Sequence, residues 1–212
     1  MEEESGRCSF VAQTLKNCVM KTKHALIAAG ITALFLSGCL PSIHKLYHDD
    51  DLVFKSELLG KWQDDDGNTW TFEKDEMGYD LTYVEDALQK NEGGPVSSDF
   101  ETHLVKLGEY YFFDLYPGDN EQLDMSSLLI SSMLPVHIFA KVEFNGNEVV
   151  VKFYNPDWLN EMLSEDRIRI AHEKTEDYTV LTASTDELQR FVTKYAEVKE
   201  AFVDPLILKR SK

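Results

Sequence analysis

Residues 138–153 read IFAKVEFNGNEVVVKF, two strand-like runs that flank Asn145-Gly146. An Asn-Gly pair between alternating apolar residues is a strong signal for a β-hairpin with a type I′ turn. The register set by this turn pairs Val142 with Val149, Ala140 with Val151 and Ile138 with Phe153. These side chains form one apolar face, so the hairpin predicts an antiparallel sheet with a buried side.

Similar runs continue on both sides of the hairpin. Short strands separated by clusters of Gly, Pro, Asn and Asp are typical of all-β sandwiches and barrels. We expect further strands at 59–63, 68–74, 79–85, 100–104, 109–115, 167–174 and 178–183. The sequence therefore predicts a mainly β fold of about nine strands, with an antiparallel barrel and a β-sandwich as the alternatives.

The strand at 109–115, EYYFFDL, is apolar on both faces. A strand of this kind should be covered on both sides. Tyr110 and Phe112 share one face, and the carboxylate of Asp114 lies on the same face. We take Tyr110, Phe112 and Asp114 as candidates for the lining of a binding cavity.

Three further segments predict helices. Asn155 can cap a short helix that begins at Pro156. The residues from Ser184 to Glu187 form a capping box, which opens an amphipathic closing helix over 185–203. The segment 122–133 is apolar and Ser-rich; it predicts a short helix that is a lid or plug in a barrel, or a cover over a sheet edge in a sandwich.

A different pattern near the N-terminus predicts attachment to a membrane. Residues 20–39 read MKTKHALIAAGITALFLSGC. Two lysines give a positive start, an uncharged apolar core follows, and the small residues Ser37 and Gly38 precede Cys39. This order is that of a secretory signal peptide.

Leu36-Ser37-Gly38-Cys39 closely resembles the lipobox of bacterial lipoproteins. The resemblance implies cleavage between Gly38 and Cys39, an S-linked diacylglycerol on Cys39, and acylation of the new amine, for example with palmitate. Such acyl chains exceed the two signals that stable membrane attachment requires. The resemblance implies a lipid-anchored protein of the cell envelope, in the cell membrane or, since Leu40 follows the cysteine, the outer membrane.

The anchor divides the chain into three predicted parts. They are a signal peptide at 1–38, a polar lipidated tether at 39–53 and a single β-rich domain at 54–212. Residues 1–19 are acidic at their start, unlike a signal peptide, so Met20 is the expected start of translation. After cleavage Cys39 is the sole cysteine, which excludes an intramolecular disulfide and a thiol nucleophile.

Gly60-Lys61-Trp62 follows a turn-like segment and is similar to the Gly-x-Trp signature of lipocalins. Bacterial lipocalins are often lipid-anchored, and the family finishes with a helix packed on the barrel. The resemblance implies a lipocalin-like antiparallel barrel with a cavity for a small apolar molecule and Trp62 closing its floor. Lipocalins also stack a basic residue of the last strand on this tryptophan, whereas 178–183 contains neither Arg nor Lys.

The composition and the motifs of the chain argue against several classes of function. The net charge of −17 argues against a nucleic-acid partner. The sequence has no recognisable catalytic, cofactor or metal motif, so we expect no enzyme. It predicts a membrane-anchored binding protein for a small apolar molecule. The alternative is an envelope scaffold or assembly factor that binds a protein partner through its acidic surface.

Overall fold

The structure is a computed structural model that describes residues 39–85, 94–118, 126–176 and 178–211. The chain divides into two units, Met1–Gly38 and Cys39–Lys212, and every described residue belongs to the second. The signal peptide predicted at 1–38 therefore lies outside the described residues. The fold described below is that of the unit Cys39–Lys212.

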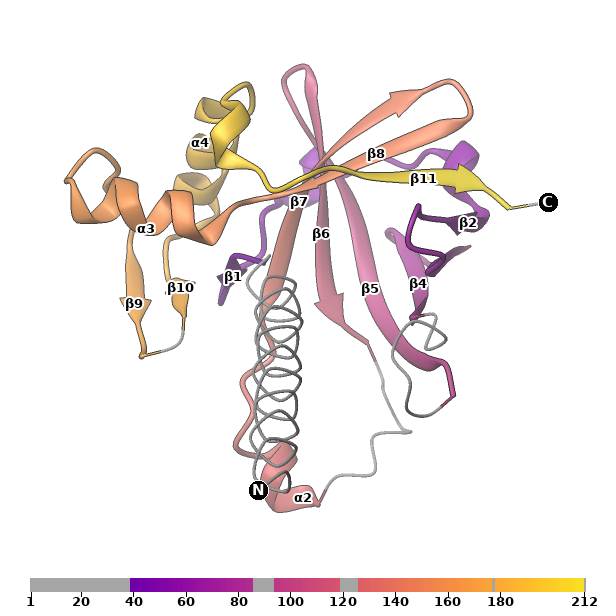
Figure 1. Cartoon of the computed structure of the whole chain (residues 1–212), viewed down its shortest axis with the longest axis horizontal. Coiled ribbons are helices and arrows are strands. Elements are labelled where there is room, and N and C mark those ends of the chain that lie inside the picture. The colour runs from indigo at the N-terminus through magenta and orange to yellow at the C-terminus, as the bar shows by residue number, and fades with distance from the viewer. Residues whose placement is uncertain (1–38, 86–93, 119–125, 177, 212) are drawn as a thin grey trace, which may run out of the picture. The chain divides into compact units, whose positions relative to one another are not determined.

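Eight strands form a closed antiparallel barrel (Figure 1). In order around the ring they are β2 (Gly60–Gln63), β3 (Thr69–Lys74), β4 (Tyr79–Glu85), β5 (Val96–Leu107), β6 (Tyr110–Pro117), β7 (His137–Asn145), β8 (Glu148–Phe153) and β11 (Leu206–Arg210). The pairing of β6 with β7, and of β11 with both β8 and β2, closes the ring. The mainly β class is confirmed, and the barrel replaces the sandwich alternative.

A second layer of short elements lies outside the barrel. It contains β1 (Pro41–Ser42), α3 (Pro156–Ser164), β9 (His172–Lys174), β10 (Thr179–Leu181) and α4 (Thr185–Lys194). β1 pairs with the start of β7 and with β10, so the sheet extends beyond the ring to eleven strands. The remaining elements are η2 (Asp49–Asp51), η3 (Ser56–Leu58), α2 (Ser127–Ile130) and η5 (Lys199–Ala201).

β6 separates two hydrophobic cores. Phe113 and Leu115 point into the barrel, where they pack with the inward side chains of the other strands. Phe112 points outward into a second core, which includes Leu188 and Phe191 of α4. The prediction that EYYFFDL is covered on both sides is confirmed.

The hairpin of β7 and β8 has a different register from the predicted one. Asn145 pairs with Glu148, so the turn begins at Gly146, which has a φ of 63°. A glycine with positive φ at the first turn position is typical of a type II′ turn. Val142 therefore pairs with Val151, two residues beyond the prediction. Because side chains alternate with a period of two, this shift keeps the predicted apolar face inside the barrel.

Residues 40–52, which we call the strap, are packed into the fold and do not form the expected tether. Leu40 and Leu46 are at most 2% exposed and belong to the outer core. The sequence did not reveal this packing because the few apolar residues of the strap follow no sustained period. As a result Cys39, which is exposed, directly precedes a buried residue.

The expected closing helix over 185–203 is shorter and does not end the fold. α4 spans Thr185–Lys194, and the chain continues through η5 into β11. The predicted capping box is present, since the Glu187 carboxylate accepts hydrogen bonds from the backbone N–H and the hydroxyl of Ser184. β11 was missed because it is short, follows Pro205 and ends in two basic residues.

Candidate functional site

Trp62 and Arg210 close one end of the barrel. Trp62 points inward from β2, and its indole N–H donates to the carbonyl of Leu58 at 2.7 Å. The guanidinium of Arg210 lies 4.3 Å from the centre of the Trp62 ring and donates to the carbonyls of Glu57 and Leu59. A cation over an aromatic face is attracted by the ring quadrupole. The basic partner of Trp62 is thus present, on a strand that the sequence did not predict.

Lys55 places a second cation at this end. Its ammonium lies 5.2 Å from the centre of the Tyr111 ring and 4.7 Å from that of Phe144. Its backbone N–H donates to the hydroxyl of Tyr79, which donates back to the Lys55 carbonyl. We call this end, defined by Lys55, Trp62 and Arg210, the closed end.

The barrel interior is lined mainly by apolar and aromatic side chains. Its buried lining includes Trp62, Trp70, Phe72, Tyr79, Leu81, Leu104, Phe113 and Leu115. Thr102 lies on β5 between the inward-facing Phe100 and Leu104 and is 1% exposed. Within the described part of the chain its hydroxyl has no hydrogen-bond partner. Burying a hydroxyl in this way costs about 1–3 kcal/mol, so the group is available to a polar atom of a ligand.

At the opposite end of the barrel, another set of partly exposed side chains contacts the inner core. Tyr83, Phe100 and Ile138 contact the inner core from positions near this end and are partly exposed. Burial, followed by the charge of Asp64, raises the pKa of Tyr83 to about 12. We call this end, defined by Tyr83, Phe100 and Ile138, the open end. The connection from β6 to β7, which contains α2, leaves the barrel here (Figure 1).

Of the four predicted lining residues, only Trp62 lies in the barrel. Tyr110, Phe112 and Asp114 lie on the outer face of β6, because the alternating residues of that strand point inward. The sequence could not show which side was inside, since both faces of the strand are apolar. Thr102 was missed, although a polar residue that alternates with the apolar Phe100 and Leu104 in the strand predicted at 100–104 was a signal that could have found it.

Asp114 joins the strap to the barrel. Its carboxylate is almost fully buried and accepts a hydrogen bond from the backbone N–H of Leu46 at 2.7 Å. The Nδ1 atom of His137 lies 2.6 Å from the other carboxylate oxygen. Removing one partner of a buried charged group leaves the other uncompensated, which is strongly destabilising. The carboxylate of Asp114 thus holds the strap, β6 and β7 together.

Two rings beside Asp114 are kept neutral by their surroundings. His103 lies opposite Asp114 on β5, and its ring stacks on Tyr47 at a distance of 4.5 Å between ring centres. Burial lowers the pKa of His103. Burial also raises the pKa of Tyr47 to about 12, and the charge of Asp114 adds to this shift. At neutral pH the stacked pair is therefore uncharged.

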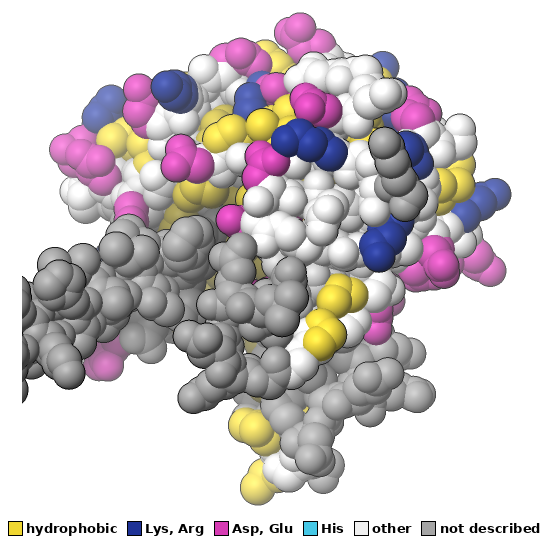
Figure 2. All heavy atoms as spheres, turned by 45° about the vertical axis from the view of Figure 1, so that its right-hand side comes forward, with side chains coloured by type: hydrophobic (Ala, Val, Ile, Leu, Met, Phe, Trp, Pro, Cys, Tyr) yellow, Lys and Arg dark blue, Asp and Glu magenta, His cyan; other side chains and the backbone are white. Residues whose placement is uncertain are grey.

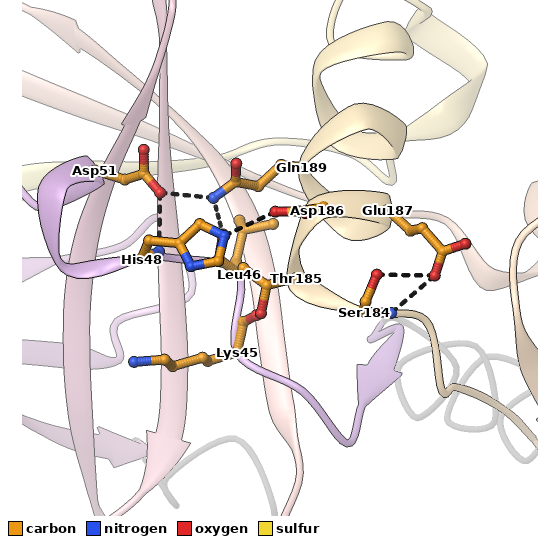
Figure 3. A network of polar contacts seen from close by, with 9 residues as sticks. All are labelled: Lys45, Leu46, His48, Asp51, Ser184, Thr185, Asp186, Glu187 and Gln189. Atoms are coloured by element: carbon orange, nitrogen blue, oxygen red, sulfur yellow. Dashed lines mark hydrogen bonds and ion pairs between the residues drawn. The ribbon is translucent and has the colours of Figure 1, made fainter.

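A polar network fastens the strap to α4 (Figure 3). Its contacts are the Gln189 amide to the Leu46 carbonyl and the Asp51 carboxylate, the Thr185 hydroxyl to the Lys45 carbonyl, and His48 to Asp186. Asp51 and His48 belong to a run rich in Asp and His. Their side chains are bound by Gln189 and Asp186 of α4. The position of the strap after Cys39 is therefore determined from both sides, by α4 and by Asp114.

Further observations limit what the site can be. In the ranges that the structure describes, no group of three or more His, Cys, Asp or Glu side chains is placed to hold a metal ion. No described helix is long and apolar enough to cross a membrane. Comparison with protein-family models, curated proteins and solved structures found no match to this chain. The barrel interior is therefore defined as the candidate site by its own geometry.

We predict that Arg210→Ala lowers the free energy of unfolding by about 2 kcal/mol, because it removes the contact with Trp62 and two charge-assisted hydrogen bonds at an exposed position. Urea denaturation measures the change. Lys209→Ala is the matched control, since the neighbouring Lys209 makes an exposed ion pair with Asp65, and exposed ion pairs contribute little to stability. Equal losses in the two variants contradict the prediction.

We predict that Thr102→Val raises the free energy of unfolding of ligand-free protein by about 1 kcal/mol, because it replaces a buried unpaired hydroxyl by a methyl group of similar size. The control is Thr82→Val on the adjacent strand, whose hydroxyl donates to Asp99 at 2.8 Å and whose loss is destabilising. Thermal and urea unfolding compare the two. If Thr102→Val is destabilised, the Thr102 hydroxyl has a hydrogen-bond partner and the prediction is wrong.

Proposed function

We propose that this protein is a bacterial lipoprotein of the cell envelope that is anchored through Cys39. We further propose that its barrel is lipocalin-like and binds a small apolar molecule without catalysing a reaction. The observation that carries the binding role is a closed, mainly apolar barrel in which the buried hydroxyl of Thr102 has no hydrogen-bond partner among the described residues. Apolar walls with a few placed polar groups are what small-molecule sites commonly present.

The anchor is supported by the lipobox and by the position of Cys39. This residue is exposed and begins the unit Cys39–Lys212. The next residue, Leu40, is packed in the outer core. Acylation of Cys39 therefore places lipid on an accessible sulfur at the surface of the folded unit and leaves both hydrophobic cores undisturbed.

The lipocalin-like character is supported by the closed end. Gly60-Lys61-Trp62 stands at the first strand of the eight-stranded ring, and Arg210 of the last strand stacks on Trp62. A tryptophan floor with a basic partner is what the resemblance implies. The chain departs from the family pattern in one respect, because α3 and α4 precede the last barrel strand and do not follow it.

A second candidate function is an envelope scaffold that binds a protein partner through its acidic surface. One observation favours it. The closed half of the barrel is filled by large side chains such as Phe72, Tyr79 and Phe113, each at most 1% exposed. Side chains that fill the interior in this way leave less space for a ligand, which favours the scaffold.

We predict that Cys39→Ser abolishes membrane attachment, because the sulfur is the proposed attachment point. Intact-mass analysis of membrane-extracted protein should show a chain that begins at Cys39 and carries lipid mass, whereas the variant should lack that mass. Cys18→Ser is the matched control and should behave like the unaltered protein. An unmodified N-terminus at Met1 or Met20 is incompatible with the proposed anchor.

We predict that an apolar compound with at least one polar group co-purifies with the protein. Mass spectrometry of small molecules released from natively purified protein identifies it. The amount should fall several-fold in Thr102→Val, which loses the interior hydroxyl, and should be unchanged in Thr82→Val. If no compound is released from any of these proteins, the binding role is wrong and the scaffold role takes its place.

A further inference from the structure

An exposed apolar segment leads from the open end into β7. Residues 126–136 read SSLLISSMLPV and contain no charged residue, in a chain of which 28% is charged. The exposed side chains are Leu128 (82%), Leu129 (47%), Ile130 (50%), Met133 (56%) and Leu134 (70%). In Figure 2 hydrophobic side chains protrude at the lower end, where α2 lies in Figure 1. Contiguous exposed apolar side chains of this kind mark interaction sites.

A second uncharged row begins at Cys39. Along β1 the residue Leu40 packs in the outer core and Ser42 is buried, whereas the alternate residues Cys39, Pro41 and Ile43 face away from that core and are partly or fully exposed; we call these three residues the outward row. Alternation of this kind is expected of a strand with one packed face. The outward row thus continues from the proposed lipid attachment point along the surface of β1.

The two uncharged surfaces lie along the same strand. β1 pairs with the start of β7, where Pro41 lies opposite Ile138, and Leu134 precedes Ile138 by four residues. Cys39 precedes Pro41 by two residues and, because the two strands are antiparallel, lies on the opposite side of this pair from Leu134. With ~3.3 Å per extended residue and ~5 Å between strands, Leu134 lies within ~25 Å of Cys39. A lipid on Cys39 and the segment 126–136 can therefore contact one bilayer surface.

The composition of the segment favours lipid over a protein partner. The cores of protein interfaces are enriched in aromatic residues, Arg and Met, of which the segment contains only Met133, and Leu and Ser are under-represented among interface hot spots. The segment 126–136 consists of Leu, Ile, Met, Ser, Pro and Val. Because it is uncharged within a chain of net charge −17, its insertion brings no carboxylate into the headgroup region.

We propose that the segment 126–136 inserts into the interface of the bilayer that carries the anchor, as a second point of membrane contact. This inference rests on the proposed lipid attachment at Cys39. Insertion holds the protein at two points and brings the open end, from which the segment leaves, to the membrane surface.

The test compares two exposed methionines. Met133 lies in the segment and is 56% exposed, whereas Met77 is 54% exposed in the turn between β3 and β4. Met133→Cys and Met77→Cys are introduced separately into the full chain, which is purified from membranes, labelled with nitrobenzoxadiazole and reconstituted into phosphatidylethanolamine–phosphatidylglycerol vesicles. An acylated Cys39 leaves the introduced cysteine as the single free thiol of the processed chain, and intact mass verifies both modifications.

On addition to vesicles, the label at position 133 should brighten several-fold and be quenched by spin-labelled phospholipids, whereas the label at position 77 should do neither. Equal responses at the two positions overturn the insertion even when intact mass shows acyl chains on Cys39. If the label at position 133 is quenched but intact mass shows no acyl chains on Cys39, insertion is supported and the proposed lipid anchor is wrong. A label at 133 that is already shielded before vesicles are added, by the barrel or by a second copy, also overturns the proposal.

Discussion

The barrel depends on the pairing of β11 between β8 and β2. Residues 206–209 pair with β8, and Lys209 and Arg210 pair with β2. Without this strand the two neighbours would each present a row of unpaired backbone groups, which proteins normally avoid. The same strand brings Arg210 over Trp62. Closure of the ring and formation of its closed end are therefore consequences of one event.

β11 reaches its place because the outer layer returns the chain to the barrel. The ammonium of Lys141, buried on the outer face of β7, donates to the carbonyl of Ala196 and to Glu197, just beyond the end of α4. Burial opposes its charge, but hydrogen bonds to Glu197 and Glu143 outweigh burial and raise the pKa of Lys141. A charged amine thus holds α4 against the barrel, and η5 and β11 follow from that position.

Local signals predicted the strands and caps well, whereas long-range relations escaped them. The alternation of β7 and β8 identified the buried face, and a shift of two residues left it unchanged. The two-sided strand β6 could not reveal which face was inside, so Phe112 and Asp114 were assigned to the wrong side. The strap follows no sustained apolar period, β11 is short, and both are held by distant partners, such as Asp114 for Leu46. Propensity alone contains no information about such partners.

The chain after Cys39 is packed into the fold, and this packing connects the proposed ligand binding with the proposed membrane insertion. Because Leu40 is buried and the strap is held by Asp114 and α4, a lipid on Cys39 cannot act as a loose tether. It brings the outward face of β1 to the bilayer, and the uncharged segment before β7 is the neighbouring surface. The open end then lies beside the acyl chains, where an apolar ligand is most concentrated. Under the two proposals such a ligand would pass from the bilayer towards Thr102 with little of its surface exposed to water, and the proposed anchor and the proposed binding role would serve one task.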